Sequence, residues 1–394
     1  MQAQEEKGTP LGIGEAARGE GVETPQRKHT HRDRTRRVWV GTVPVGGGAP
    51  ISVQSMTKTS TLDVAGTVDQ INRLATSGCE IVRVAVPDVD SARALGVIIS
   101  RVSVPVVADV HFDYRVALAA IDAGAHKIRI NPGNIGGRER VKAVVQAAMG
   151  RNIPIRVGVN AGSLEERLVK KFPGRPAAAL VTSARDNIRL LEDLGFRDIV
   201  ISVKASDVVT TVEAYELIAG ESEYPLHVGV TEAGTVWAGT VRSALGLGII
   251  LSKGIGDTLR ISLTGDPLHE IRAGWEVLKA LGLRRRGATV VSCPTCGRCE
   301  VDLTSIASLV EEGVADIDEP LRIAVMGCAV NGPGEASEAD VGLAAGKAGA
   351  LLFRQGKLVR KVRVSEMVES LVREAHVVAA EKGEAAEGAE SGGG

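Results

Sequence analysis

Eight short runs of β-branched and apolar residues recur along the first two-thirds of the chain. They are residues 51–56, 80–86, 104–110, 126–132, 153–160, 198–205, 226–234 and 258–265. Most of the segments between them, such as "TVDQINRLATSGC", have the periodicity of amphipathic helices. Strands that alternate with helices are typical of parallel βαβ units, and eight units in roughly 230 residues favour a closed TIM-type (β/α)₈ barrel. No glycine-rich dinucleotide fingerprint follows the first run, which disfavours an open doubly wound sheet.

The periodic pattern breaks at residues 283–290, "LRRRGATV", and a smaller α+β unit follows. We expect it to contain a helix near "LTSIASLVEEGV", a strand at "RIAVMGC", a hairpin through "LLFRQGKLVRKV" and a helix from Ser365. The predicted domains are therefore a barrel over residues 38–284 and an α+β domain over residues 285–376. Residues 1–37 lack apolar periodicity and the final "EKGEAAEGAESGGG" is low in complexity, so residues 1–37 and 377–394 are predicted to be disordered.

Composition narrows the class of protein further. The 394 residues carry a formal net charge of −1, so no overall field attracts the chain to nucleic acid or to a membrane surface. No apolar run approaches the ~20 residues of a membrane span, and the N-terminus lacks the apolar core of a signal peptide. We expect a cytoplasmic protein without nucleic-acid or membrane partners.

The carboxyl ends of the predicted strands are unusually polar for a barrel, whose strands are mostly Val, Ile and Leu. The residues concerned are Arg83, Asp109, His111, Arg129, Asn131, Arg156, Asn160, Lys204, Glu232, Arg260 and Ser262. Several pairs, such as Asp109 and His111, are two residues apart, so both members face the same side of the chain. Barrel enzymes place their chemistry at this end of the strands, which makes these side chains candidates for a binding site.

Five of these side chains are cations from five different strands: Arg83, Arg129, Arg156, Lys204 and Arg260. A buried unpaired cation is unfavourable, and the carboxylates of Asp109 and Glu232 can balance only two of the five. The pattern therefore favours a polyanion site, and specifically a diphosphate, over arginine–carboxylate pairs that merely close the barrel. His111 has no second histidine at metal-ligand spacing, so a hydrogen-bond donor or general acid is favoured over a metal ligand.

Four of the five cysteines fall within 36 residues, in "SCPTCGRCE" and "MGCAVNGPGE". In a reducing compartment such clustering favours a metal over disulfides. A structural zinc usually uses a second paired knuckle, whereas Cys-x₂-Cys-x₂-Cys followed by a distant cysteine is closer to iron–sulfur ligation. The spacing alone leaves zinc and unliganded thiols open as alternatives. The fifth cysteine, Cys79, is expected to be a buried small residue.

Segments along nearly the whole chain resemble the 4-hydroxy-3-methylbut-2-en-1-yl diphosphate synthase family in its two-domain bacterial form. They include "ADVHFDYRVA", "KIRINPGNIG", "PIRVGVNAGSLE", "SCPTCGR" and "GCAVNGPGEA", and the resemblance runs from about Arg36 to about Glu369. It implies reductive ring opening and dehydroxylation of 2-C-methyl-D-erythritol 2,4-cyclodiphosphate in non-mevalonate isoprenoid biosynthesis. It also implies a 4Fe–4S cluster as cofactor, with flavodoxin or ferredoxin as the electron donor.

The resemblance assigns roles residue by residue. Cys293, Cys296, Cys328 and Glu335 match the family's cluster ligands. The diphosphate-contacting positions are matched by Arg83, Arg129, Asn131, Arg156, Asn160, Lys204, Arg260 and Ser262. Asp109, His111 and Glu232 match polar groups near the reacting end, and with Glu335 they are the candidate catalytic residues. A carboxylate on one iron is harder and more easily displaced than a thiolate, which leaves that iron open to the substrate.

One position departs from the family pattern, because Cys299 falls where the family usually has no cysteine. A Cys299 that replaced Glu335 would give a cluster with no open iron, but the Glu335 motif is intact and we expect Cys299 not to be a ligand. The resemblance further implies a head-to-tail homodimer, in which the cluster domain of one chain caps the barrel of the other. Two rival functions are a non-redox phosphate-ligand barrel enzyme with a structural zinc ribbon, and a scaffold for cluster transfer.

Overall fold

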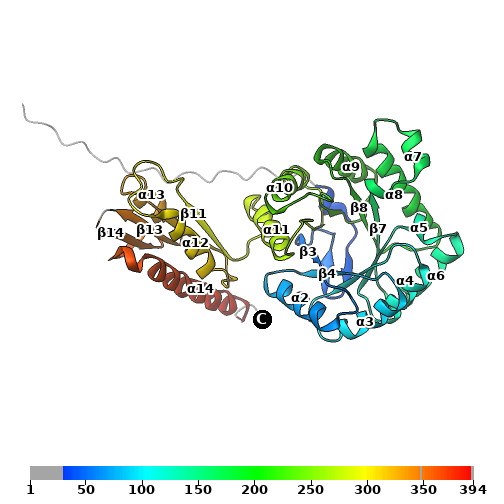
Figure 1. Cartoon of the computed structure of the whole chain (residues 1–394), viewed down its shortest axis with the longest axis horizontal. Coiled ribbons are helices and arrows are strands. Elements are labelled where there is room, and N and C mark those ends of the chain that lie inside the picture. The colour runs from blue at the N-terminus through cyan, green and yellow to red at the C-terminus, as the bar shows by residue number, and fades with distance from the viewer. Residues whose placement is uncertain (1–29, 347, 392–394) are drawn as a thin grey trace, which may run out of the picture.

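The computed structural model describes residues 30–346 and 348–391. Its first domain is a barrel of eight parallel strands, shown on the right of Figure 1. The strands are β3 (Ser52–Met56), β4 (Ile81–Ala85), β5 (Val106–Asp109), β6 (Lys127–Ile130), β7 (Ile155–Asn160), β8 (Ile199–Lys204), β9 (His227–Val228) and β10 (Thr258–Leu259).

The strands follow the order β8-β7-β6-β5-β4-β3-β10-β9. A parallel bridge between Ile201 on β8 and Leu226, the residue before β9, joins the two ends of this order. The predicted (β/α)₈ barrel is thus confirmed. Strands β9 and β10 are only two residues long each, because the backbone leaves the sheet after Val228 and Leu259. The later residues of those two runs, which include Glu232, Arg260 and Ser262, lie in the loops above the barrel.

A helix of at least nine residues follows each barrel strand, and together these helices surround the sheet (Figure 1). They are α2 (Val64–Thr76), α3 (Val89–Ile99), α4 (Tyr114–Asp122), α6 (Arg138–Arg151), α8 (Pro176–Asp193), α9 (Val208–Glu221), α10 (Val236–Ser252) and α11 (Leu268–Ala280). Two short helices, α5 (Pro132–Ile135) and α7 (Glu166–Lys171), lie in the connections. Aspartates such as Asp63 and Asp88 accept backbone N–H bonds at helix N-termini and define where these helices begin.

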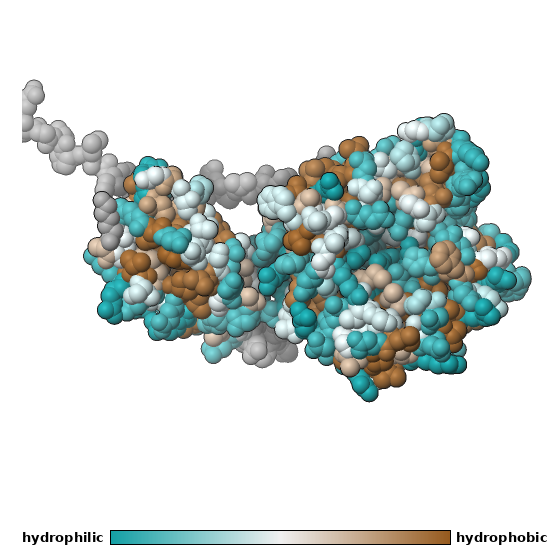
Figure 2. Space-filling view, viewed as in Figure 1, coloured by the Kyte–Doolittle hydropathy of each residue, from teal (hydrophilic) through white to brown (hydrophobic). Residues whose placement is uncertain are grey.

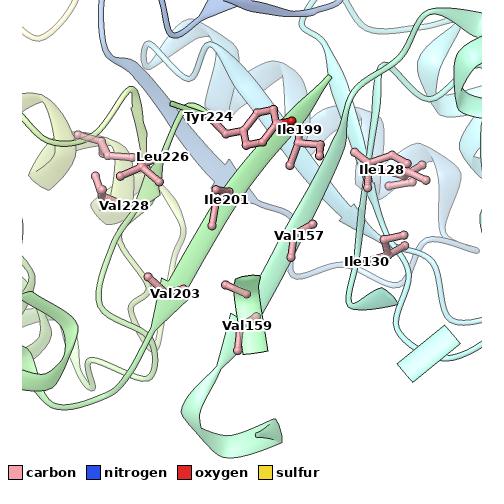
Figure 3. Close-up of a cluster of buried hydrophobic side chains, with 14 of the residues drawn as sticks. Ile128, Ile130, Val157, Val159, Ile199, Ile201, Val203, Tyr224, Leu226 and Val228 are labelled. Atoms are coloured by element: carbon pink, nitrogen blue, oxygen red, sulfur yellow. The ribbon is translucent and has the colours of Figure 1, made fainter. Parts of the chain in front are cut away.

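Along the barrel strands, apolar residues that pack in the hydrophobic core alternate with residues that face the inside of the barrel. Figure 3 shows apolar side chains from neighbouring strands that pack into one buried cluster. They include Ile128, Ile130, Val157, Val159, Ile199, Ile201 and Val203. Because successive side chains of a strand point to opposite faces, the residues between them face the inside of the barrel. Lys127, Arg129, Arg156 and Lys204 are among these inward residues.

The amino end of the barrel is closed by the hairpin of β1 (Val38–Val40) and β2 (Val43–Val45). Three of its valines form one buried cluster with Ile81, Val107 and Val200 from the bottom of the barrel strands. The carboxyl end is therefore left as the open face for polar chemistry.

Residues 30–37 are ordered, which corrects the predicted disordered extension over residues 1–37. They contain the short helix α1 (His31–Arg34). The His31 ring is hydrogen-bonded to the carbonyl of Ser222 at 2.9 Å, and the Thr35 hydroxyl donates to Asp257 at 3.0 Å. These contacts anchor the segment to the barrel, and a pattern of apolar periodicity could not reveal them. Residues 1–29 lie outside the described part.

The second domain is a five-stranded mixed sheet with helices. Its strands are β11 (Ala288–Ser292), β12 (Leu321–Met326), β13 (Val341–Gly346), β14 (Gly349–Arg354) and β15 (Lys357–Val362), paired in that order. Its helices are α12 (Leu303–Gly313), α13 (Gly332–Ser337) and α14 (Met367–Ser391). The predicted α+β domain is confirmed, and Figure 2 shows it beside the barrel as a separate body.

Helix α14 corrects the predicted disordered tail over residues 377–394, because it continues to Ser391. Val378 and Ala379 are buried in the core of the second domain, so the helix cannot end at residue 376. Alanine and glutamate, which with glycine make up most of this low-complexity stretch, are strong helix formers. None of the helices in the described ranges is long and apolar enough to cross a membrane.

Candidate active site and cysteine centre

Asp109 is the point at which several predicted site residues meet inside the barrel. Its carboxylate lies 3.2 Å from Arg129 Nη1 and 3.5 Å from Arg83 Nε. His111 Nε2 lies 3.6 Å from the same carboxylate and 2.7 Å from Arg129 Nη1. Burial raises the pKa of Asp109, but Arg83, His111, Arg129 and Arg156 outweigh it and hold that pKa well below its usual range. Asp109 is therefore a fixed carboxylate that neighbouring cations surround.

Gly158 on β7 permits this arrangement. A Cβ at residue 158 would lie 2.5 Å from Arg129 Nε, so any larger residue would displace the guanidinium. Arg129 Nη2 also donates to the Gly158 carbonyl at 3.3 Å. Gly229, after β9, allows a close backbone approach as well, because a Cβ there would lie 2.3 Å from the Arg260 carbonyl oxygen and 2.7 Å from Lys204 Nζ. The glycines of these motifs thus make room for long cationic side chains.

Arg260 has a partner that sequence reasoning missed. Glu270, on helix α11, is fully buried and accepts from Arg260 Nη2 at 3.2 Å and Nε at 3.3 Å. It also accepts from the Ser55 hydroxyl at 2.8 Å, and Lys58 Nζ lies 3.4 Å away. Ser262 accepts from Arg260 Nη1 at 2.6 Å. Glu270 lies on a helix rather than at a strand end, and no local signal marks it as an inward-facing residue.

The inside of the barrel holds more positive than negative charge. Six cations are buried or nearly so: Arg83, Lys127, Arg129, Arg156, Lys204 and Arg260. The buried carboxylates that pair with this set are Asp109 and Glu270. Lys127, Arg156 and Lys204 have no ion pair to a carboxylate among the described residues.

Burial, followed by repulsion from other cations, holds the pKa of Lys127, Lys204 and Arg156 well below the usual range of each group. His227, on β9, faces the same interior and lies 3.2 Å from Arg156 Nη1. Burial and then Lys204 depress its pKa as well. This concentration of unbalanced charge fits a multiply charged anion.

The other predicted site residues lie at the rim, and the structure does not join them to Asp109. Asn131 is buried and its side chain caps helix α5 by accepting from Gly133 N–H at 3.2 Å. Asn160 is half-buried at the end of β7. Glu232 is exposed in a positive-φ conformation (52°), and its carboxylate forms no ion pair with the described residues. Beside Asp109, the carboxylate that balances the interior charge is thus Glu270, whereas we expected Glu232.

The four clustered cysteines gather around residues 327 and 328 of the second domain. A Cβ at Gly327 would lie 2.5 Å from Cys299 Sγ and 3.5 Å from Cys293 Sγ, so both sulfurs pack against this glycine. Arg298 links the other two, since it is hydrogen-bonded to Cys296 and attracted to Cys328. None of the five cysteines, all of which are described, forms a disulfide. Cys79, by contrast, is buried in the barrel core, and burial raises its pKa to about 12.

Two of these thiols lie in surroundings that favour thiolate. The backbone N–H groups of Asn331 and Val330 lower the pKa of Cys328, which precedes helix α13. The backbone and then the side chain of Arg298 lower the pKa of Cys296. Glu335 is exposed on α13, and its side chain has no ion pair or hydrogen bond to the described residues.

Within the described ranges, no three His, Cys, Asp or Glu side chains are arranged tightly enough to hold a single metal ion. Ligands of a four-iron cluster each bind a different iron and are spaced further apart than the ligands of one ion. The donor set of three soft thiolates and one carboxylate fits such a cluster.

Both domains match models of a known family. Residues 35–275 match the GcpE TIM-barrel domain, and residues 289–377 match the GcpE protein C-terminal domain. The chain is 56% identical over 349 residues to the 4-hydroxy-3-methylbut-2-en-1-yl diphosphate synthase (flavodoxin) of Geobacter sulfurreducens, a match that covers 89% of this chain and 99% of that protein. It is also 56% identical over 352 residues to the enzyme of that name from Bacillus subtilis, with 89% and 93% covered. The chain therefore belongs to the GcpE family.

Proposed function

We propose that the cationic interior of the barrel binds 2-C-methyl-D-erythritol 2,4-cyclodiphosphate, and that a 4Fe–4S cluster on the second domain supplies electrons for its reduction. The reaction is the one for which the family's curated relatives are named, so the chain is an oxidoreductase that forms 4-hydroxy-3-methylbut-2-enyl diphosphate. Two electrons and two protons open the ring and release one oxygen as water. The single observation that carries the proposal is the excess of buried positive charge over Asp109 and Glu270, the two buried carboxylates that pair with these cations.

The diphosphate is assigned to the inward-facing cations. Arg83, Arg129 and Arg260 can each form two parallel bonds with a phosphate, and Lys204 adds a point charge. We assign Arg156, Asn131, Asn160 and Ser262 to the same ligand, from above or beside these groups. Asp109 and Glu270 fix Arg129 and Arg260 before the ligand arrives, so these side chains lose little conformational entropy on binding.

We assign proton handling to the rim of the barrel. His111 lies against both Asp109 and Arg129 and is half exposed, so it can exchange protons with solvent while it remains oriented. Glu232 is the second candidate, because its carboxylate is free at the mouth. Asp109 is too strongly held as a carboxylate to donate a proton, so its part is to orient His111 and Arg129.

Cys293, Cys296, Cys328 and Glu335 would hold the cluster, which when bound supplies electrons one at a time. The thiolate-favouring surroundings of Cys296 and Cys328 and the unpaired carboxylate of Glu335 support this ligand set. The position of Cys299 is explained by contacts within the second domain, without a role in binding the cluster. Its thiol donates to the Val301 carbonyl at 3.3 Å, and its side chain packs on the core of the second domain.

Flavodoxin is the proposed electron donor, because the relatives are named for it. A head-to-tail homodimer would bring the cluster domain of one chain over the barrel of the other, and closure over the substrate would exclude water from the reaction. A cytoplasmic location is proposed because four of the five cysteines cluster in a pattern typical of a metal centre rather than of the disulfides that an oxidising compartment favours.

The test is an anaerobic assay of the reconstituted full-length protein with the cyclodiphosphate and reduced flavodoxin. We expect 4-hydroxy-3-methylbut-2-enyl diphosphate and a broad brown visible absorbance from the protein. A protein that contains zinc and no iron, or one that carries the cluster and leaves the cyclodiphosphate unchanged, would refute the proposal.

A further inference from the structure

Lys127 lies at the bottom of the cationic interior, and the proposed function assigns it no role. It begins strand β6 and faces the inside of the barrel, two residues before Arg129. Its side chain is fully buried. Its register partner on β5 is Val107, which belongs to the apolar cluster that closes the amino end of the barrel. The Lys127 amine is thus enclosed between an apolar floor and a layer of arginines.

The amine has no partner in this enclosure. Lys127 Nζ makes no hydrogen bond to any described residue. The charged or titratable groups of the same interior, taken strand by strand, are Arg83 on β4, Asp109 on β5, Arg129 on β6, Arg156 on β7, Lys204 on β8, His227 on β9 and Arg260 after β10. Two carboxylates reach this interior and both are already paired, Asp109 with Arg83 and Arg129, and Glu270 of α11 with Arg260.

An ammonium group in such a place is unfavourable unless an anion accompanies it. Burial, and then Arg156 and Arg83, hold the pKa of Lys127 well below its usual range. In the ligand-free protein these surroundings therefore favour the uncharged amine. An anion bound among the arginines above would instead favour the protonated amine, because it brings negative charge close to Lys127.

We propose that Lys127 is a positioning residue that takes up a proton when the cyclic diphosphate binds, and that its ammonium group then supports the ligand from the bottom of the barrel. This inference rests on the proposed function, because it takes the bound anion to be the cyclic diphosphate. Binding and protonation are then linked, so each favours the other. Above the pKa of the free amine, affinity for the ligand should fall about tenfold for each unit of rising pH.

Proton uptake can be counted by calorimetry. The full-length, anaerobically reconstituted protein is titrated with the cyclodiphosphate at pH 8, without reductant, in Tris and in HEPES. The dependence of the binding heat on the ionisation enthalpy of the buffer gives the number of protons taken up. Each phosphorus of the ligand has one strongly acidic hydroxyl, so the ligand itself does not titrate there. A Lys127→Met variant should take up about one proton fewer than the wild type.

The matched control is Lys142→Met, which removes an exposed lysine from α6, the first long helix after β6. It should keep the wild-type proton count, because Lys204 and His227 have the same surroundings in this control as in the wild type. In Lys127→Met the repulsion between Lys127 and His227 is also lost. A purely structural role of Lys127 would change stability and leave the proton count unchanged. If the methionine variant does not fold, Lys127→Gln makes the same comparison.

The outcomes separate the two proposals. A Lys127→Met protein that binds the ligand with the wild-type proton count overturns the inference and leaves the diphosphate site standing. A wild-type affinity that is equal at pH 7 and pH 9 also overturns it. A wild-type protein that does not bind the cyclodiphosphate at all refutes the proposed site, and the inference with it.

Discussion

Replacing Glu270 by glutamine should destabilise the barrel strongly. Glu270 is fully buried and accepts two bonds from Arg260, one from Ser55 and one from the backbone N–H of Leu263. Glutamine keeps the shape of the side chain and removes its charge. Arg260 is then left as a buried cation without a carboxylate partner, and one of the two oxygens that accept from it becomes an NH₂ donor. Removing one member of a buried ion pair costs about 3–5 kcal/mol, and we expect a loss of unfolding free energy in that range.

The chain allows this loss to be measured on the barrel alone. Its three tryptophans, Trp39, Trp237 and Trp275, all precede the second domain, so their fluorescence during urea unfolding reports on the barrel. Urea is preferred to guanidinium because it does not screen charges. The comparison is made on the midpoint and slope of this one transition, since a two-domain chain need not unfold in a single step.

Glu276→Gln on the same helix is the matched control. Its partner is Lys279, but the Glu276 side chain is 65% exposed, and exposed pairs of this kind contribute about 0–1 kcal/mol. A Glu270→Gln loss below about 1 kcal/mol, or one equal to that of the control, would show that Arg260 is not held by this ion pair, and the argument would fail.

Three further predictions concern the cysteine centre and the carboxylate of Asp109. Cys299→Ser should keep nearly normal iron content and turnover, because its thiol contacts the Val301 carbonyl; loss of the cluster in an iron assay would make Cys299 a ligand. Glu335→Ala should reduce turnover far more than iron content, because three thiolates remain, and equal losses of both would contradict the proposed open iron. The folded-state pKa of Asp109 is depressed, so its stabilising effect is present at neutral pH and is lost as pH falls below the ordinary carboxyl value of 3.8. Asp109→Asn should therefore lower stability at pH 7 and flatten the acid limb of the stability profile below the ordinary carboxyl pKa of 3.8; parallel profiles for variant and wild type would count against this account.

Much of the fold could be predicted because its signals are local. Each of the eight β-branched runs contains a barrel strand, and the break at residues 283–290 separates α11 from β11. Inward-facing cations such as Arg129 and Arg156 could be identified from alternation, since each lies between apolar neighbours that pack in the core.

The ends of the ordered chain could not be predicted in the same way. His31 and Thr35 are held by residues about 190 and 220 positions away, Ser222 and Asp257, and no local pattern records such contacts. At the other end, the low complexity of the final residues favoured disorder. The burial of Val378 and Ala379 instead carries α14 beyond residue 376.

The period of side chains and the order of motifs were enough to predict the barrel strands, most cations that face the barrel interior and the family. Which charges meet could be seen only in the folded chain. It placed Glu270 rather than Glu232 against the cations, left Lys127 without a hydrogen-bond partner among the described residues, and set Cys299 beside Cys293 on Gly327. Ion pairing and burial depend on distances between residues far apart in the chain, and closure of the barrel sets those distances.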